Sequence, residues 1–223
     1  MVINQNQIQQ HQLHIPIEAG TILEGFLTVP KQAKALIIFV HGSGSSRFSS
    51  RNQYVASVLQ KNKFATLLMD LLTQEEHDID AISGKLRFDI ALLTKRIVVA
   101  TQWLRRYSET KKMIAGYFGA STGAAAALAA AALLPRKIFA VVSRGGRPDL
   151  AIQSLNKVKV PVLFLVGEND TNVLEMNKDA YIKLVVEKKL IIIPGATHLF
   201  EEEGSLEIVA SNAAEWFNMH LPK

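Results

Sequence analysis

Short apolar runs alternate with amphipathic stretches along most of the chain. The apolar runs contain few polar residues, which is typical of strands buried on both faces of a parallel sheet. They lie at residues 35–40, 64–69, 112–118, 138–142, 161–166 and 190–193. Between them, apolar residues recur every three or four positions, the period of a helix with one buried face. The predicted helices span residues 52–60, 85–107, 124–134, 149–155, 175–187 and 205–220.

The N-terminal part of the chain has a different pattern. Residues 12–17 and 21–29 have the character of two strands joined by a short turn, which predicts an antiparallel hairpin. Residues 1–11 are polar and rich in glutamine, so we expect a tail there. Farther along, residues 71–83 are acidic and show no clear period, and we expect an irregular surface excursion.

Together these elements predict an α/β fold. It has an eight-stranded, mostly parallel sheet with an N-terminal antiparallel hairpin and helices on both faces. No internal repeat, linker or break in composition divides residues 1–223, so we expect a single domain. In sheets of this kind, ligands bind beyond the carboxyl ends of the strands. The loops that follow the strands are therefore where chemistry is expected.

Composition narrows the possible functions. The 223 residues carry a formal net charge of +5, but the basic residues are scattered, which argues against nucleic-acid binding. The chain has no cysteine, which excludes disulfides, thiolate metal sites and a cysteine nucleophile. The polar N-terminus lacks the layout of a signal peptide, and no apolar run approaches the ~20 residues of a membrane span. We therefore expect a cytoplasmic protein that needs no membrane.

One stretch has the form of a nucleophile elbow. The predicted strand 112–118 leads into Gly119-Ala120-Ser121-Thr122-Gly123, and an alanine-rich helix follows. G-x-S-x-G between a strand and a helix holds a serine in a strained turn with its hydroxyl exposed. Larger side chains two residues before and after the serine would collide there, which accounts for the two glycines. Taken alone, the pattern also fits a strand–helix turn with a surface serine.

Three other loops carry residues that complement this serine. The segment 41–44 follows the third strand, Asp170 follows the seventh, and His198 follows the eighth. A serine hydroxyl needs a base within hydrogen-bond reach, and His198 is suited to accept its proton. Asp170 is suited to orient the imidazole, although Glu168 is a second carboxylate in the same loop. The order Ser121, Asp170, His198 is that of α/β-hydrolases.

The chain resembles the α/β-hydrolase superfamily, and most closely its small dienelactone-hydrolase-like members. The resemblance rests on segments 41–44, 119–123, 167–170 and 195–200, each of which follows its own predicted strand. It implies acyl transfer to water with Ser121, Asp170 and His198 as a catalytic triad and without a metal or cofactor. Dienelactone hydrolases use a cysteine where this chain has Ser121, so the resemblance favours ester chemistry over lactone-ring opening.

A tetrahedral intermediate in such a reaction needs backbone N–H donors. One is expected from Thr122, the residue after the nucleophile, and the other from Ser43 rather than Gly44 in the loop after the third strand. His41, which begins that loop, is expected to pack and to hydrogen-bond beneath it. His77 lies among acidic residues, and a solvated loop is a simpler explanation than a metal site.

Four arginines lie at the expected active-site edge, and two interpretations remain open for them. They are Arg47, Arg51, Arg144 and Arg147. Each either pairs with a carboxylate of the protein or binds an anionic group of the substrate through its guanidinium fork. The internal partners considered are Asp70, Asp89 and Asp149. If an arginine contacts substrate, Arg144 or Arg147 is the leading candidate.

The sequence therefore predicts a serine hydrolase that cleaves a small ester, thioester or related acyl compound. Residues 143–159 leave no room for a large cap, so we expect an open site with 71–83 as its only candidate lid. A peptidase or acyltransferase on the same triad remains an alternative, as does a non-catalytic binding protein of this fold. A small-molecule acyl substrate is the expected partner, and the protein is expected to be a monomer or homodimer.

Overall fold

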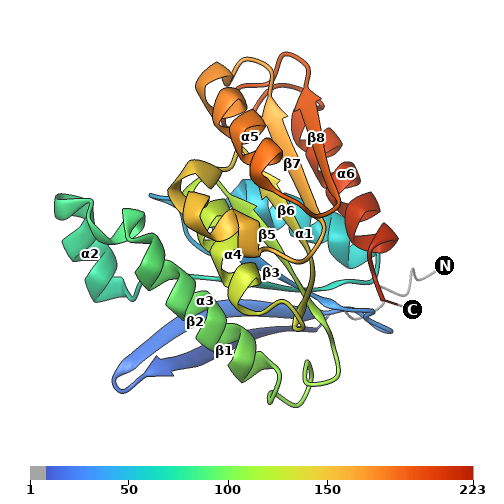
Figure 1. Cartoon of the computed structure of the whole chain (residues 1–223). Coiled ribbons are helices and arrows are strands. Elements are labelled where there is room, and N and C mark those ends of the chain that lie inside the picture. Colours follow the sequence, from blue (N-terminus) through green and yellow to red (C-terminus); the bar gives the residue numbers. More distant parts are fainter. Residues whose placement is uncertain (1–8, 223) are drawn as a thin grey trace.

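The computed structural model describes residues 9–222, and within them eight strands form one sheet (Figure 1). Its order is β1-β2-β4-β3-β5-β6-β7-β8. The pairs β1–β2 and β2–β4 are antiparallel, and the remaining neighbours are parallel. The predicted mixed sheet with an N-terminal hairpin is confirmed. The strands are β1 (Gln9–Glu18), β2 (Thr21–Val29), β3 (Leu36–Val40), β4 (Ala65–Met69), β5 (Ala115–Ala120), β6 (Ile138–Arg144), β7 (Val162–Gly167) and β8 (Lys188–Ile193).

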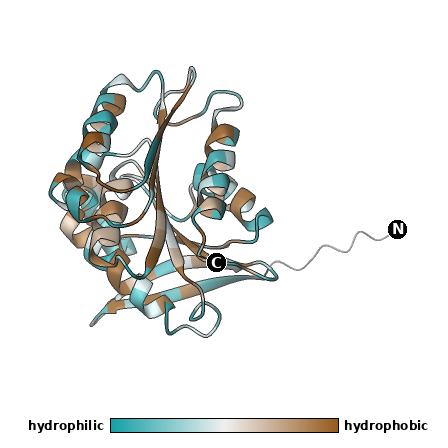
Figure 2. Ribbon diagram, turned by 45° about the vertical axis from the view of Figure 1, so that its right-hand side comes forward, coloured by the Kyte–Doolittle hydropathy of each residue, from teal (hydrophilic) through white to brown (hydrophobic). Residues whose placement is uncertain are grey.

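Helices cover both faces of the sheet, as predicted. One apolar cluster joins one face to α1 and α6, and another joins the opposite face to α3, α4 and α5. Figure 2 shows the apolar sheet between helices whose outer surfaces are more hydrophilic. The helices are α1 (Ser50–Lys61), α2 (Gln74–Ser83), α3 (Ile90–Leu104), α4 (Thr122–Leu133), α5 (Thr171–Lys183) and α6 (Ser205–Met219), with 3-10 segments η1 (Leu86–Phe88) and η2 (Pro148–Lys157).

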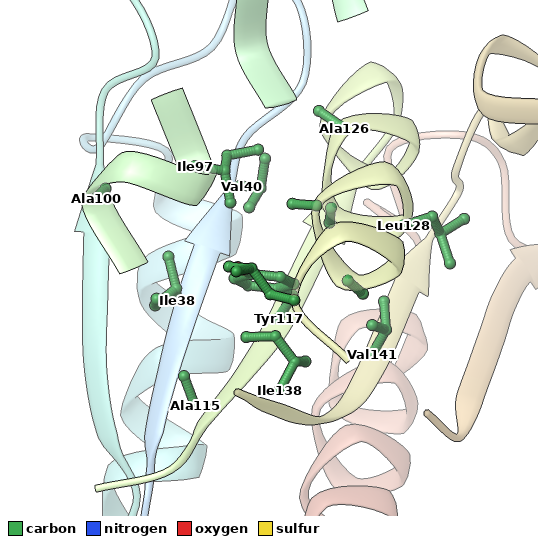
Figure 3. Close-up of a cluster of buried hydrophobic side chains, with 14 of the residues drawn as sticks. Ile38, Val40, Ile97, Ala100, Ala115, Tyr117, Ala126, Leu128, Ile138 and Val141 are labelled. Atoms are coloured by element: carbon green, nitrogen blue, oxygen red, sulfur yellow. The ribbon is translucent and has the colours of Figure 1, made fainter. Parts of the chain in front are cut away.

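The helix α4 is buried along almost its whole length, which explains its alanines. Small side chains let the helix lie close to β5. A helix that is buried on all sides is expected to be apolar around its whole circumference. Beneath it, Tyr117 of β5 is fully buried in an apolar cluster (Figure 3). Its hydroxyl lies 2.7 Å from Thr101 Oγ1 of α3. Burial raises the pKa of the Tyr117 phenol, so it stays neutral. This packing fixes the strand that carries the candidate nucleophile.

The segment 71–83 differs from its prediction, because most of it forms α2. Thr73 accepts a hydrogen bond from the Glu76 N–H, and the Glu76 carboxylate accepts one from the Thr73 N–H, which makes a capping box. The helix ends at Gly84, whose φ of 63° reverses the chain. Acidic residues are favourable in a first turn, so the local charge that suggested a loop instead stabilises this helix.

Other boundaries also differ from the sequence prediction. Residues 1–8 of the predicted tail lie outside the described part of the chain, whereas 9–11 belong to β1. The predicted helix 85–107 is two elements, η1 and α3, because Asp89 caps α3 by accepting a hydrogen bond from the Leu92 N–H. Among the described helices, none combines the length and apolar character needed to cross a membrane.

Candidate active site

Ser121 occupies the turn between β5 and α4 in a strained backbone conformation. Its φ of 51° and ψ of −124° lie outside the regions that non-glycine residues favour. A Cβ atom at Gly119 would lie 2.5 Å from Ala124 Cα, and one at Gly123 would lie 2.2 Å from the His41 carbonyl oxygen. The two glycines are therefore required by contact with backbone, and the turn has the geometry of a nucleophile elbow.

The backbone of Ser121 is held from both sides. Its N–H donates to the Arg144 carbonyl oxygen at 3.1 Å, and its own carbonyl accepts from the Arg147 N–H at 3.0 Å. By contrast, the Ser121 hydroxyl has no hydrogen-bond partner among residues 9–222. A fixed backbone with an unengaged hydroxyl is compatible with the predicted role of Ser121 as a nucleophile.

His198 and Asp170 come together from the loops after β8 and β7. His198 Nδ1 lies 2.6 Å from Asp170 Oδ2, and the aspartate side chain is only 14% exposed. A proton on Nδ1 is donated to this carboxylate, which leaves Nε2 as the basic nitrogen. The structure thus joins the predicted base to the predicted orienting acid. His198 Nε2 and the Ser121 hydroxyl are not hydrogen-bonded to each other.

The second carboxylate of the β7 loop has a different partner. Glu168 Oε2 accepts a hydrogen bond from the Gly195 N–H at 2.8 Å, which ties the β7 loop to the turn after β8. Gly145 lies on the other side of the histidine with a φ of 50°, and a Cβ atom there would be 3.4 Å from His198 Nδ1. Glu168 and Gly145 therefore shape the loops around His198, and Asp170 contacts its ring.

The loop after β3 lies directly against the elbow. A Cβ atom at Gly42 would lie 2.9 Å from Ser121 Cβ, so the loop passes Ser121 in close contact. The Ser43 N–H donates to Thr122 Oγ1 at 2.9 Å, and Thr122 is the first residue of α4. The structure thus places the two predicted N–H donors beside Ser121, with the Ser43 N–H already engaged by a hydroxyl. The sequence analysis missed this hydroxyl, because spacing along the chain carries no signal for it.

His41 lies beneath this loop and is partly buried, as expected. Its Nδ1 lies 2.9 Å from the Gly42 carbonyl oxygen, and its Nε2 accepts a hydrogen bond from the Leu71 N–H at 3.2 Å. Burial holds the pKa of the His41 imidazole below its ordinary value, although the Gly42 carbonyl and Asp70 oppose the effect. The neutral ring therefore links the ends of β3 and β4 and supports the loop that carries Ser43.

The four arginines fall into two groups. Arg47 forms ion pairs with Asp70 and Glu24, and its backbone N–H also donates to Asp70. Arg147 makes a two-pronged pair with Asp149, at 2.9 and 2.7 Å. These two have the internal partners that the sequence offered as one interpretation.

The other two arginines lie together near the His198 loop. Arg51 pairs with Glu201 at 2.8 Å. Arg144 is buried and forms no ion pair with any described residue.

A cavity of about 510 Å³ opens beside the candidate oxyanion donors. Its wall includes Ser43 and Thr122, and it extends between the β2 and β4 ends and α2. Ser121 itself is not part of the lining, so the cavity adjoins the candidate nucleophile on the side of Ser43 and Thr122. The walls mix apolar side chains with the ion pairs of Arg47 and of Arg87 with Asp80. Within residues 9–222, no cluster of three or more metal-ligating acidic, cysteine or histidine residues occurs.

The fold and the order of these loops define an α/β-hydrolase. Residues 23–220 match the dienelactone hydrolase family, and the chain belongs to that family. A dienelactone hydrolase from Anabaena variabilis is 52% identical, with a TM-score of 0.94 over 97% of this chain and 100% of that one. Est1E from Butyrivibrio proteoclasticus shares the fold at 18% identity, with a TM-score of 0.80 over 95% of this chain and 99% of that one.

A curated relative from Mycobacterium tuberculosis H37Rv has a different kind of name. It is called a putative phosphoribosyl transferase and is 50% identical over 208 residues, which are 93% of this chain. The same region is 46% of the relative, so this chain spans about half of its length.

Proposed function

We propose that the protein is a serine hydrolase that cleaves a small ester, thioester or related acyl compound. The observation that carries the proposal is the 2.6 Å contact of His198 with Asp170, in loops that flank a strained serine elbow. A serine with an oriented imidazole nearby is the arrangement that activates a hydroxyl at neutral pH. The proposal rests on Ser121, His198 and Asp170 acting as one unit.

In the first half of the reaction, the Ser121 oxygen attacks the acyl carbon as His198 Nε2 takes the hydroxyl proton. Asp170 stabilises the imidazolium that forms, because its carboxylate accepts the Nδ1 proton. The Thr122 and Ser43 N–H groups stabilise the oxyanion of the tetrahedral intermediate. His198 then donates its proton to the leaving alcohol or thiol, and an acyl-serine remains.

In the second half, water attacks the acyl-serine. His198 removes a proton from that water, and the second tetrahedral intermediate collapses as the proton returns to Ser121. The products are a carboxylic acid and the free enzyme, and no metal or cofactor enters either half. The location of Ser121 at the N-terminus of α4 adds a favourable field for the developing negative charge.

Named relatives support an ester as the bond that is cleaved. Est1E has been solved with ferulic acid bound, and an esterase from Pyrococcus furiosus has the same fold at 16% identity. A promiscuous phosphotriesterase, P91, is also dienelactone-hydrolase-like. In this chain η2 occupies the β6–β7 connection without a large cap, so the proposed substrate is small or has an exposed acyl group.

The name of the M. tuberculosis relative does not argue for phosphoribosyl transfer by this chain. The matched region is less than half of that relative, and the name describes the relative as a whole. A peptidase or acyltransferase would use the same triad and differ in the acyl donor or acceptor. A non-catalytic binding protein would have no need of the strained backbone at Ser121.

The decisive experiment is covalent labelling with a fluorophosphonate probe, beside a panel of aryl esters and thioesters of increasing acyl length. We expect the wild-type protein to be labelled and active, and the Ser121→Ala variant to lose both properties. Ser211→Ala, which removes an exposed hydroxyl on α6, is the matched control and should behave as wild type. A folded wild-type protein that the probe does not label would rule out the hydrolase proposal.

A further inference from the structure

Arg144 is the last residue of β6 and lies beside the candidate nucleophile. It pairs in register with Ala120 of β5, and its carbonyl oxygen accepts the Ser121 N–H at 3.1 Å. Its side chain lies toward the His198 loop, with the guanidinium carbon 5.9 Å from the centre of the Phe200 ring. The backbone and the side chain of Arg144 thus contact the segments that carry the proposed nucleophile and base.

The guanidinium of Arg144 is buried without a counter-ion. The residue is 8% exposed, and Nη1 has no hydrogen-bond partner among residues 9–222. No carboxylate of the described chain lies within 4.0 Å of its nitrogens. By comparison, Arg96 is also buried, but its Nη1 and Nη2 donate to the Glu76 carboxylate, and Nη1 also donates to the Leu71 carbonyl oxygen. The environment of Arg144 is therefore unlike that of an arginine that stabilises the fold.

The surroundings of Arg144 add positive charge. Arg51 is the charged neighbour that acts on Arg144, and Arg51 itself pairs with Glu201. Arg51 lies in the first turn of α1, a turn without acidic residues, where the helix dipole is positive. Burial, with repulsion from Arg51, lowers the pKa of Arg144 to about 10, so it remains charged at neutral pH.

A buried charge without a partner costs free energy, and proteins tolerate it where a ligand supplies the partner. Arginine is suited to this role because its planar fork matches the oxygens of a carboxylate or phosphate. We propose that Arg144, assisted by Arg51, forms an anion subsite that binds a carboxylate or phosphate group of the substrate. The inference rests on the proposed hydrolase function and narrows its substrates to anionic acyl compounds.

The test compares matched anionic and neutral esters in wild type, Arg144→Gln and Arg144→Lys. In the first pair, mono-4-nitrophenyl succinate carries a negative charge on its acyl part, and 4-nitrophenyl butyrate is its neutral counterpart. In the second pair, acetoxybenzoate carries the negative charge on its leaving group, and its methyl ester is the neutral counterpart. Arg136→Gln removes the same charge at an exposed site before β6, at the opposite end of the sheet. The measured quantity is the ratio of kcat/KM for the anionic and neutral members of each pair.

In Arg144→Gln we expect kcat/KM for the anionic ester of one pair to fall about 10- to 100-fold, with the neutral ester within about threefold. Arg144→Lys should recover part of the loss, since it keeps the charge without the fork, and Arg136→Gln should match wild type. The pair that responds identifies which part of the substrate carries the anion. An unchanged ratio in both pairs for a folded Arg144→Gln protein would overturn the anion subsite.

A binding measurement separates this inference from the hydrolase proposal. Succinate and inorganic phosphate are added to each protein, and the melting temperature is recorded. At least one of the two anions should raise the melting temperature of wild type and Arg136→Gln but not of Arg144→Gln. Equal shifts in all three proteins would contradict the anion subsite even if Ser121 is labelled. Loss of the shift in Arg144→Gln would support the subsite even if no ester is cleaved.

Discussion

The Ser43 N–H donates to Thr122 Oγ1 at 2.9 Å, across 79 positions of the chain. Both residues contribute proposed oxyanion donors, and this bond holds the loop after β3 against the start of α4. The Thr122 hydroxyl therefore fixes the position of the Ser43 N–H in the loop that contacts Ser121. We therefore propose that Thr122 acts as a positioning residue through its side chain, in addition to the proposed role of its backbone N–H as a donor.

Replacing Thr122 by valine should weaken catalysis without disrupting the helix. The change removes the acceptor for the Ser43 N–H and keeps the shape of the side chain. We expect kcat to fall about five- to tenfold, the size of one net hydrogen bond, with KM little changed. Thr122→Ser retains the hydroxyl and should recover most of the activity. A fall confined to KM, or no recovery with serine, would contradict the positioning role.

Asp170 and Glu168 allow the two carboxylates of one loop to be tested against each other. Asp170→Asn should lower kcat about 10³- to 10⁴-fold, because an amide no longer stabilises the imidazolium of His198. Glu168→Gln should keep kcat within about threefold, since its contact is the Gly195 N–H and a glutamine oxygen still accepts that bond. Kinetics with one activated ester decide the matter, and a larger effect at Glu168 would reverse the assignment.

The order of strands and helices could be predicted from the sequence because strands buried on both faces appear in it as continuous apolar runs. It failed at α2, where acidic residues suggested a loop and the capping box of Thr73 with Glu76 makes a helix. It identified Ser121 and the candidate loops, but spacing alone does not decide between Asp170 and Glu168. That choice depends on side-chain direction, which only the folded loops define.

The partners of the arginines also depend on side-chain directions that the sequence does not define. The sequence placed Arg47, Arg144 and Arg147 at one edge of the sheet and left their partners open. Arg47 finds Glu24 on the neighbouring hairpin, a contact that no local pattern predicts. Three expectations stay predictions: that residues 1–223 form a single domain, that the protein is cytoplasmic, and that it is a monomer or homodimer.

The glycine at position 123 should be irreplaceable. In Gly123→Ala, the new Cβ atom would lie 2.2 and 2.3 Å from the His41 and Val40 carbonyl oxygens, which are backbone atoms and cannot rotate away. We expect the free energy of unfolding to fall by about 3 kcal/mol or more. Gly20→Ala, with a φ of 79° but no atom within 4 Å, should cost only about 1–2 kcal/mol. Urea unfolding measures both, and equal losses would contradict the close contact at the elbow.

His41 should make stability depend on pH below neutrality. Its pKa in the folded protein lies below the ordinary value of about 6.5, so the folded state binds the proton less readily than the unfolded chain. The stabilisation is therefore complete above about pH 6.5 and is lost as the pH falls toward the folded pKa, at up to about 1.4 kcal/mol per pH unit. Protonation also places a donor at Nε2 opposite the Leu71 N–H, where an acceptor is needed.

His41→Gln removes this titration, because a glutamine stays neutral and its oxygen can accept the Leu71 N–H. We expect the variant to be less stable than wild type at pH 7.5, where the packing of the ring is lost. Its stability should fall less steeply between pH 6.5 and 5, so that the two unfolding curves converge on acidification. His14→Gln, at a largely exposed position on β1, should keep the wild-type slope. Parallel pH dependences for wild type and His41→Gln would show that His41 is not the titrating group.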